Sequence, residues 1–263
     1  HMVLHAGHGE FPRFIFAPGS PEQAFFLTNK AFDLAEKYQV PSFVLFDTYL
    51  SDSQWTYRGF DLSRLRNTDY RLRGGRFAQL PDYKRYGDAR NGVMPLAVPG
   101  DGKHLVIADS DEHDESGHLT EDAALRIKMT KKRLFNKLPD MIREIAPPFL
   151  YGDHQPDIVL ACWGSLYGLV REAVDALASS YGIAMLHFSE LYPFPSTDRL
   201  DYLGLLRNAR LTLCVEQNAT GQLSRLMKTE TGFEFSEHVL KYDGRPFMVE
   251  ELVKELKKKI SRL

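Results

Sequence analysis

The sequence predicts an α/β protein with two parallel-sheet domains, and two patterns support this prediction. Short apolar runs at residues 14–17 and 43–46 flank a helical stretch, which gives a strand–helix–strand unit. From residue 157 onward, strand-like apolar runs and helical stretches alternate along the chain. The strand runs are continuously apolar, as is typical of strands buried on both faces of a parallel sheet.

The helix of the first unit has a recognisable beginning. Ser20 is a suitable N-cap, Pro21 stands at the first helical position, and Gln23 completes a capping-box pattern. Apolar residues then recur with a period of about 3.6 as far as Tyr38, and Pro41 introduces the second apolar run. We therefore expect a βαβ unit near the start of the chain.

A long irregular stretch follows this unit. Residues 51–107 lack sustained periodicity and are rich in Arg, Gly and Asp, as in functional lids, interface arms or disordered segments. After an acidic segment, residues 120–137 are predicted to form a basic helix with Thr120 as its N-cap. Pro147 and Pro148 mark a linker.

The remainder of the chain is more regular, and we place the domain boundary near residue 147. The first domain then comprises residues 1–146, and the second comprises residues 147–263. The expected elements of the second domain are strand 157–162, helix 166–179, strand 183–188, helix 198–208, strand 211–216, helix 220–228, a short strand near 239–242 and helix 248–261.

Composition excludes several classes of protein. The 263 residues carry 33 Lys and Arg against 35 Asp and Glu, so nothing indicates nucleic acid or anionic lipid as a partner. A hydrophobic content of 43% is sufficient for a sizeable core. No apolar run approaches the roughly 18 residues that span a bilayer, and the N-terminus shows no signal pattern. We expect a cytoplasmic protein with no membrane contact.

The two cysteines are expected to be buried, reduced thiols. Cys162 and Cys214 lie within strand-like apolar runs, and no Cys-x-x-Cys pattern is present. An iron–sulfur cluster usually takes four thiolates, so this chain cannot hold one alone.

Gly7-His8-Gly9-Glu10 is the first candidate site. Its glycines permit close approach of a ligand or cofactor, and His8 and Glu10 supply an imidazole and a carboxylate for proton transfer or for orienting a partner. The alternative is a turn with a surface histidine.

Two further segments contain metal-ligating residue types, and a simpler interpretation is favoured for both. Residues 112–118 combine two histidines with several acids, but no helix fixes their geometry, so a polar interface or helix-entry loop is expected rather than a metal site. Gly100-Asp101-Gly102 is typical of the start of a thiamine diphosphate and Mg²⁺ site. It lacks the preceding apolar strand, and Asn136 lies within a predicted helix, so we expect a turn.

Residues 215–222 form another candidate site. They lie at the carboxyl end of a predicted parallel strand and begin a helix, which is where ligands gather in open α/β sheets. Glu216 and Asn218 add polar groups, and Thr220 and Gly221 lead into the helix. The alternative is a tight strand-to-helix turn used for packing.

Trp163-Gly164-Ser165 occupies the equivalent position after the first strand of the second domain. Ser165 is expected to cap the next helix, and Trp163 is expected to pack. Neither a G-x-S-x-G elbow nor an H-E-x-x-H pattern is present, so a hydrolase is disfavoured.

Seven segments together resemble the α subunits of 2-oxoacid:ferredoxin oxidoreductases, the 2-oxoglutarate type in particular. They run in family order across nearly the whole chain. The segments are GHGEFPR (7–13), APGSPEQAFFLTNKAFDLAEKYQVPSFVLFDTYLSDS (17–53), SDEHDESGHLTEDAALRIKMTKKR (110–133), CWGSLYG (162–168), LYPFP (191–195), VEQNATGQLSRLMKTETG (215–232) and KYDGRPF (241–247).

The resemblance implies a fold and an activity. The first domain would be the C-terminal half of a pyrimidine-type thiamine diphosphate-binding domain, and the second would resemble the transketolase C-terminal domain. The enzyme would oxidatively decarboxylate a 2-oxoacid to its acyl-CoA, with coenzyme A as co-substrate and ferredoxin as electron acceptor. Thiamine diphosphate would be shared with a β subunit, which in this family carries the Mg²⁺ site and the [4Fe-4S] cluster.

The resemblance also assigns roles to the candidate residues. His8 and Glu10 would be catalytic, close to the pyrimidine pocket. Cofactor-binding positions would be Gly7, Gly9, Asp47, Glu216, Asn218, Thr220 and Gly221.

The front half of the cofactor domain, with its Tyr-Pro-Ile-Thr-Pro and Gly-Gly-Pro-Ser-Thr-Gly segments, is not in this sequence, and His1-Met2 resembles a cloning remnant. We therefore expect a piece of a longer chain that is inactive alone. The alternative function is a non-catalytic assembly module that clamps a β subunit.

Overall fold

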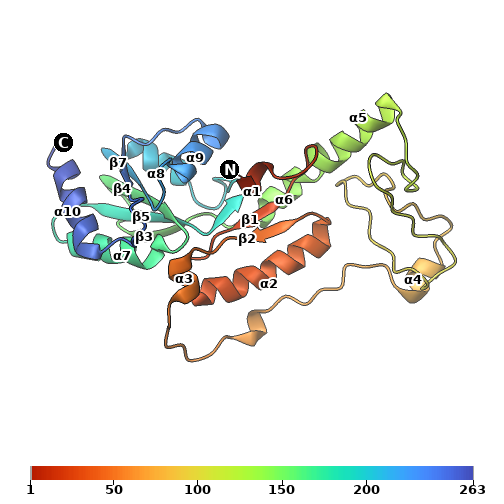
Figure 1. Ribbon diagram of the computed structural model, residues 1–263, viewed down its shortest axis with the longest axis horizontal. Coiled ribbons are helices and arrows are strands. Elements are labelled where there is room, and N and C mark those ends of the chain that lie inside the picture. Colours follow the sequence, from red (N-terminus) through yellow and green to blue (C-terminus); the bar gives the residue numbers. More distant parts are fainter. Residues whose placement is uncertain (1, 263) are drawn as a thin grey trace.

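The computed structural model describes residues 2–262, which form two sheets lying side by side (Figure 1). The first sheet has the strand order β2–β1–β6, and the second has the order β3–β5–β4–β7–β8. The strands are β1 Phe14–Phe16, β2 Ser42–Val44, β3 Phe149–Gly152, β4 Ile158–Trp163, β5 Ile183–Phe188, β6 Glu190–Tyr192, β7 Leu211–Glu216 and β8 Glu237–Leu240. The helices are α1 Met2–His5, α2 Pro21–Tyr38, α3 Thr48–Asp52, η1 Leu62–Arg64, α4 Gly74–Ala78, α5 Ala123–Lys131, the π-helical turn η2 Lys132–Asn136, α6 Leu138–Glu144, α7 Leu166–Leu177, α8 Tyr202–Asn208, α9 Gln222–Thr231 and α10 Val249–Ile260.

The predicted βαβ unit is present, and its helix begins where the capping residues indicate. The Ser20 hydroxyl accepts a hydrogen bond from the Gln23 amide at 3.2 Å, and the Gln23 side chain accepts one from the Gly19 amide at 2.8 Å. The helix ends at Tyr38, where Gln39 adopts a left-handed conformation. Strands β1 and β2 pair in parallel on the same side of this helix.

The two faces of β1 contribute to different cores. Phe14 and Phe16 pack with α2 and α6 in a cluster that includes Leu34 and Met141. Ile15, on the opposite face, belongs to a cluster that also contains Phe188, Leu223 and Met227 of the second half of the chain. The two sheets therefore share a hydrophobic core, which the burial of apolar surface stabilises.

The second sheet follows the predicted strand–helix alternation closely. Strands 183–188 and 211–216 have the expected bounds, and β4 begins one residue later than expected. Helices α7 and α10 cover one face and α8 and α9 cover the other, as Figure 1 shows. The α8 helix begins at Tyr202 rather than near residue 198, because Asp201 caps it by accepting a hydrogen bond from the Gly204 amide at 2.8 Å.

The α/β class is confirmed, and the sheets are rich in parallel pairs, but each also contains an antiparallel strand. β3 pairs antiparallel with β5, and β6 pairs antiparallel with β1. β6 follows β5 almost directly in the chain, yet it completes the first sheet. A strand from the sequence of the second domain thus lies in the sheet of the first, and the division at residue 147 stays a prediction.

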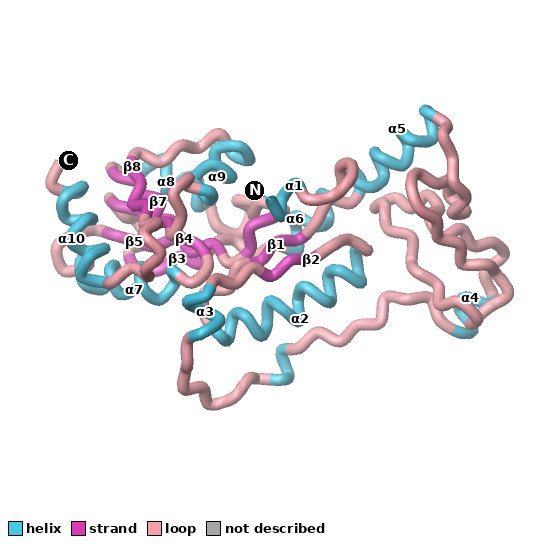
Figure 2. The backbone as a smooth tube through the Cα atoms, viewed as in Figure 1, coloured by secondary structure: helices cyan, strands magenta, loops and turns pink. Residues whose placement is uncertain are grey.

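Residues 53–122 form an arm that leaves the first sheet and returns through α5 (Figure 2). Phe77, Tyr83 and Ala97 make a small core within it. The sequence predicts Thr120 as the N-cap of this helix, but α5 begins at Ala123. The Thr120 hydroxyl accepts a hydrogen bond from the Asp122 amide, and the Asp122 side chain then caps the helix by accepting one from the Leu125 amide.

The acidic loop before α5 is a polar packing element. Glu112 is 9% exposed and accepts hydrogen bonds from Arg126 at 2.9 Å and from Arg133 at 2.8 and 2.7 Å. The His113 ring stacks on Tyr86, with 3.7 Å between ring centroids. Within residues 2–262, no group of three or more His, Cys, Asp or Glu side chains is arranged to hold a metal ion.

Gly100-Asp101-Gly102 forms a turn, as expected. The Asp101 amide donates a hydrogen bond to the Val98 carbonyl, and its carboxylate accepts one from the Gly74 amide at 3.3 Å. In the part of the chain that the structure describes, no helix is long and apolar enough to cross a membrane.

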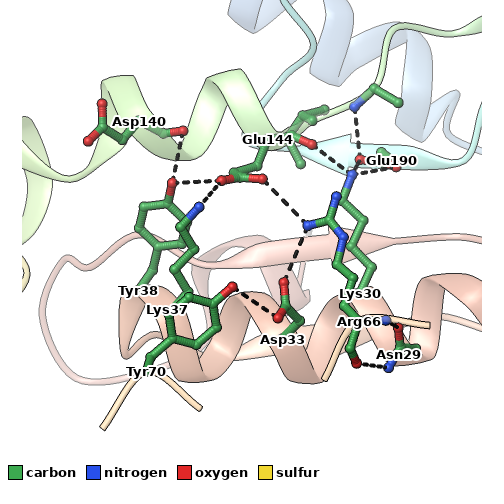
Figure 3. A network of polar contacts seen from close by, with 12 residues as sticks. Asn29, Lys30, Asp33, Lys37, Tyr38, Arg66, Tyr70, Asp140, Glu144 and Glu190 are labelled. Carbon is green, nitrogen blue, oxygen red and sulfur yellow. Dashed lines mark hydrogen bonds and ion pairs between the residues drawn. The ribbon is translucent and has the colours of Figure 1, made fainter. Parts of the chain in front are cut away.

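A buried ion pair connects α2 to β6, the strand that completes the first sheet (Figure 3). Lys30 of α2 donates to both carboxylate oxygens of Glu190 in β6, at 2.9 and 2.7 Å, and also to the Glu144 carbonyl at 2.7 Å. The same carboxylate accepts a hydrogen bond from the Ala146 amide at 2.9 Å. The side chains of Lys30 and Glu190 are only 14% and 6% exposed. These contacts therefore fix the positions of helix α2, the end of α6 and β6 relative to one another.

The base of the arm joins the same network. Glu144 contacts Lys37 and accepts a hydrogen bond from the Tyr38 hydroxyl at 3.1 Å. Arg66 of the arm lies 3.3 Å from Asp33 and 3.7 Å from Glu144. Burial, together with the adjacent Glu144 carboxylate, raises the pKa of Tyr38 well above its ordinary value.

Glu190→Ala tests the ion pair. Removing one partner leaves the ammonium group of Lys30 buried without its counter-charge, so we expect a loss of about 3 kcal/mol in the free energy of unfolding. Chemical denaturation measures this loss. Asp140→Ala is the control, because it breaks the more exposed pair with Arg143 and should cost less than about 1 kcal/mol. Equal stability of the Glu190 variant and the parent would contradict the assignment.

Candidate functional site

The carboxyl ends of parallel strands from both sheets converge on a cleft at the junction of the sheets. Chain leaving β2 contributes Asp47, chain leaving β4 contributes Trp163 and Ser165, and chain leaving β7 contributes Gln217. In open α/β sheets this edge is where ligands bind. The junction of the sheets is therefore a candidate functional site.

Asp47 and Ser165 hold the two sides of this cleft together. One carboxylate oxygen of Asp47 caps α3 by accepting a hydrogen bond from the Leu50 amide at 2.9 Å. The other oxygen accepts a hydrogen bond from the Ser165 hydroxyl. Ser165 stands at the N-cap position of α7, as predicted, but its backbone is helical and its hydroxyl makes no capping bond, because it donates across the junction instead.

Glu216 is buried, and its carboxylate is fully engaged inside the chain. It accepts hydrogen bonds from Trp163 Nε1 at 3.1 Å, from the Asn218 side chain at 2.8 Å, and from the Leu223 and Ser224 amides at 2.9 and 3.1 Å. These two amides belong to the first turn of α9, where the helix dipole favours a negative charge. Glu216 thus joins β7, the β4 turn and α9.

The other residues of this turn are also committed to local structure. The Asn218 side-chain oxygen accepts hydrogen bonds from the Thr220 amide at 3.1 Å and the Gln222 amide at 3.3 Å. Gly221 has φ of 61°, a conformation that disfavours residues with a side chain. The arrangement is that of a strand-to-helix turn, and contact of Glu216, Asn218, Thr220 and Gly221 with a cofactor stays a prediction.

The loop of residues 7–10 is open to solvent. Both its glycines have positive φ, 126° at Gly7 and 76° at Gly9, and the side chains of His8 and Glu10 are exposed. Within the described residues, neither side chain makes a hydrogen bond. Arg13 holds the base of the loop by donating to the carbonyls of Val3 and Ala6. His8 and Glu10 are therefore free to contact a ligand or another chain.

The structure does not unite the predicted residues in one site. Glu10 borders a hollow that also contains Arg13, Tyr192 and Glu230. A separate apolar hollow, lined by Leu4, Ile15, Trp163, Leu223 and Leu226 among others, adjoins both this hollow and the Asp47 cleft through shared residues. The candidate residues are thus spread along one edge of the molecule.

His187 is a part of the junction that sequence analysis did not find. It is fully buried in β5, and Nε2 lies 2.9 Å from the Gly164 carbonyl oxygen. Burial lowers its pKa to about 4. A Cβ atom on Gly19 would lie 2.8 Å from this nitrogen, so the glycine permits the close approach. No signal marks His187 in the sequence, because it stands within a continuous strand.

This geometry defines a class of protein: two parallel-rich sheets that share a core and place their strand ends at a common edge. No model of a known protein family matches the chain. Curated relatives do match. The α subunit of 2-oxoacid:ferredoxin oxidoreductase 1 from Sulfurisphaera tokodaii is 33% identical over 98% of this chain and 40% of its own length. The corresponding subunit from Aeropyrum pernix is 32% identical over 95% of this chain and 39% of its own length.

A solved structure agrees with these relatives. The 2-oxoglutarate:ferredoxin oxidoreductase from Magnetococcus marinus, with 2-oxoglutarate, coenzyme A and succinyl-CoA bound, has a TM-score of 0.86 and 29% sequence identity. The match covers 98% of this chain and 44% of that one. The comparisons confirm the resemblance: over nearly all its length, the chain matches a C-terminal portion of 2-oxoacid:ferredoxin oxidoreductase α subunits. It spans about 40% of the length of these curated relatives.

Glu216→Ala tests the packing role of this carboxylate. The change leaves two α9 amides and the indole N–H of Trp163 without their acceptor in a buried place, so the free energy of unfolding should fall by about 3 kcal/mol. Denaturation followed by tryptophan fluorescence measures it. The exposed pair of Lys228 with Glu234 provides the control, and Glu234→Ala should cost less than about 1 kcal/mol. A similarly small cost at Glu216 would refute the role.

His187 predicts a specific pH dependence of stability. Above pH 6.5 the imidazole is neutral in both states and contributes nothing. As the pH falls from 6.5 towards 4, the unfolded chain binds a proton that the folded chain does not, so the free energy of unfolding falls by up to about 3 kcal/mol. Denaturation midpoints measured from pH 8 to 4 should fall more steeply for the parent than for His187→Gln. Parallel curves would show that His187 does not titrate abnormally.

Proposed function

We propose that this chain is part of the α subunit of a thiamine-dependent 2-oxoacid:ferredoxin oxidoreductase. The complete enzyme oxidatively decarboxylates a 2-oxoacid, with 2-oxoglutarate favoured, to its acyl-CoA and passes the electrons to ferredoxin. The observation that supports this proposal most strongly is the match in sequence and fold across nearly all of the chain to the Magnetococcus marinus enzyme. Coenzyme A is the proposed co-substrate.

The chemistry of the two cysteines supports a proposal about which subunit carries the metal groups. Cys162 and Cys214 are both buried, in the cores on opposite faces of the second sheet, and desolvation raises the pKa of both thiols. Neither suits a cluster that takes four thiolates. We therefore assign the [4Fe-4S] cluster and the Mg²⁺ site to a β subunit, from which electrons pass to ferredoxin.

Two groups of candidate residues differ in whether they can contact thiamine diphosphate directly. Residues at the strand ends form one group, and the loop of residues 7–10 forms the other. Glu216 and Asn218 have their polar atoms occupied within the chain, and Asp47 has both carboxylate oxygens occupied. Because their polar atoms are occupied, these three residues are suited to holding the surrounding turns in place and not to contacting the cofactor. His8 and Glu10 have free polar atoms on a loop whose glycines allow close approach, so they suit direct contact with the cofactor.

Thiamine diphosphate, when bound, supplies the carbon nucleophile and the electron sink for decarboxylation. In the proposed enzyme, the His8 imidazole and the Glu10 carboxylate hold or move protons beside it. Since the chain covers a minor part of its relatives, we propose that it has no activity alone.

An assembly role is the second candidate, and one surface favours it. A groove between α2 and the arm is lined by Phe25, Phe32, Phe46 and Phe60, and the Phe32 side chain is 72% exposed. Apolar surface of this kind marks interaction sites. On this account the chain only clamps a β subunit, and the loop of residues 7–10 has no part in catalysis.

His8→Ala and Glu10→Ala, made in the complete αβ enzyme, separate the two functions. If these groups handle protons, the kcat/KM for 2-oxoglutarate with a viologen acceptor should fall by about 100-fold or more, while the subunits still assemble. His118→Ala, a change at an exposed arm residue, is the control. Unchanged kcat/KM in both variants would remove His8 and Glu10 from the catalytic list and favour the assembly role.

A further inference from the structure

A second cleft adjoins the Asp47 cleft and has a different chemical character. It lies between α3, the first turns of α7 and the loop that leads into α10, and its volume is about 390 Å³. This volume falls within the range of small-molecule sites. Its lining includes Tyr49, Trp55, Glu172, Gln217, Phe247 and Glu250.

Three aromatic side chains, Tyr49, Trp55 and Phe247, are among the residues that line this cleft. The side chains of Tyr49 and Trp55 are 49% and 50% exposed, although large aromatic side chains are usually buried. Phe247 also lines the cleft, and the ammonium nitrogen of Lys241 lies 5.6 Å from the centre of the Phe247 ring. A ring of this cleft thus already contacts a cationic group, which the ring quadrupole attracts.

The charges of the lining are all negative. Glu172 of α7 and Glu250 of α10 border the cleft, and no Lys, Arg or His residue does so. Among residues 2–262, neither carboxylate has a basic partner within 4.0 Å. Capping of α10 uses the neighbouring Glu251, whose side chain accepts a hydrogen bond from the Met248 amide. Both carboxylates are therefore free to face a ligand.

We propose that this cleft binds a small organic cation that carries an alkylated ammonium group. Aromatic faces together with unpaired carboxylates attract such a group, because it combines apolar surface with positive charge. The same lining repels phosphates and carboxylic acids, including 2-oxoacids. A bare metal ion fits poorly, because among residues 2–262 no three His, Cys, Asp or Glu side chains are grouped so that they could hold one. The site is independent of the loop of residues 7–10 and of the proposed oxidoreductase activity.

The two tryptophans of the chain make the proposal directly measurable. Trp55 lines the cleft, and Trp163 lines the adjoining Asp47 cleft, which shares Ser165 and Gln217 with it. Choline is the probe, and 3,3-dimethyl-1-butanol, which has the same shape without the charge, is its matched control. Both are titrated into the purified chain at constant ionic strength, and tryptophan fluorescence is recorded.

We expect a saturable fluorescence change with choline at about tenfold lower concentration than with the neutral alcohol. A linear, non-saturating response to choline, or equal half-saturation by the two compounds, would overturn the proposal. Because this is direct binding to the chain, the outcome does not depend on whether the oxidoreductase assignment is correct.

Charge-neutral variants test the assigned carboxylates. The double variant Glu172→Gln, Glu250→Gln keeps the shape of the cleft and should lose the preference for choline over the alcohol. Glu121→Gln, an exposed change on the arm away from the cleft, should keep it. Thermal unfolding shows that each variant is folded. Retention of the full preference by the double variant would also contradict the proposal.

Discussion

The pairing of β6 with β1, stabilised by the buried contact of Lys30 with Glu190, is the constraint on which the rest of the structure depends. Glu190 lies opposite Phe16 in the first sheet, although it follows the central strands of the second sheet in the chain. Its carboxylate is compensated by Lys30 and by the Ala146 amide. Because a buried charge without partners is costly, α2, the linker after α6 and β6 must lie together. The two sheets consequently share a core and a common edge.

The common edge explains why so many of its polar side chains bond to one another. Asp47 and Ser165 are 118 residues apart in the chain, yet their contact closes the junction. Glu216 connects Trp163 to the first turn of α9 in the same region. These groups fix the turns at the strand ends, whereas the side chains of His8 and Glu10 in the loop of residues 7–10 are exposed and available to a ligand.

Local chemistry was predictable from the sequence, and long-range pairing was not. Ser20 and Pro21 mark the start of α2 because capping depends on a few adjacent residues, and strands 183–188 and 211–216 follow from continuous apolar runs. The three residues of β6 are too few to show a period, and their partner is distant in sequence. The roles of Ser165 and Glu216 likewise depend on which groups the fold places nearby. Glu216 stands at the end of β7, as its apolar run predicts, but its contacts are not predictable from the sequence, and the binding roles of the candidate residues stay predictions.

Native-state hydrogen exchange tests most directly whether the two sheets form one cooperative unit. The Ala17 amide, which donates to the Ser189 carbonyl, represents the contact of the first sheet with the segment leading into β6, and the β4 amides represent the centre of the second sheet. We predict that both open with the same free energy, close to that of global unfolding. Rapid exchange at Ala17 through local opening, with β4 still protected, would show that the sheets fold independently and would contradict the account.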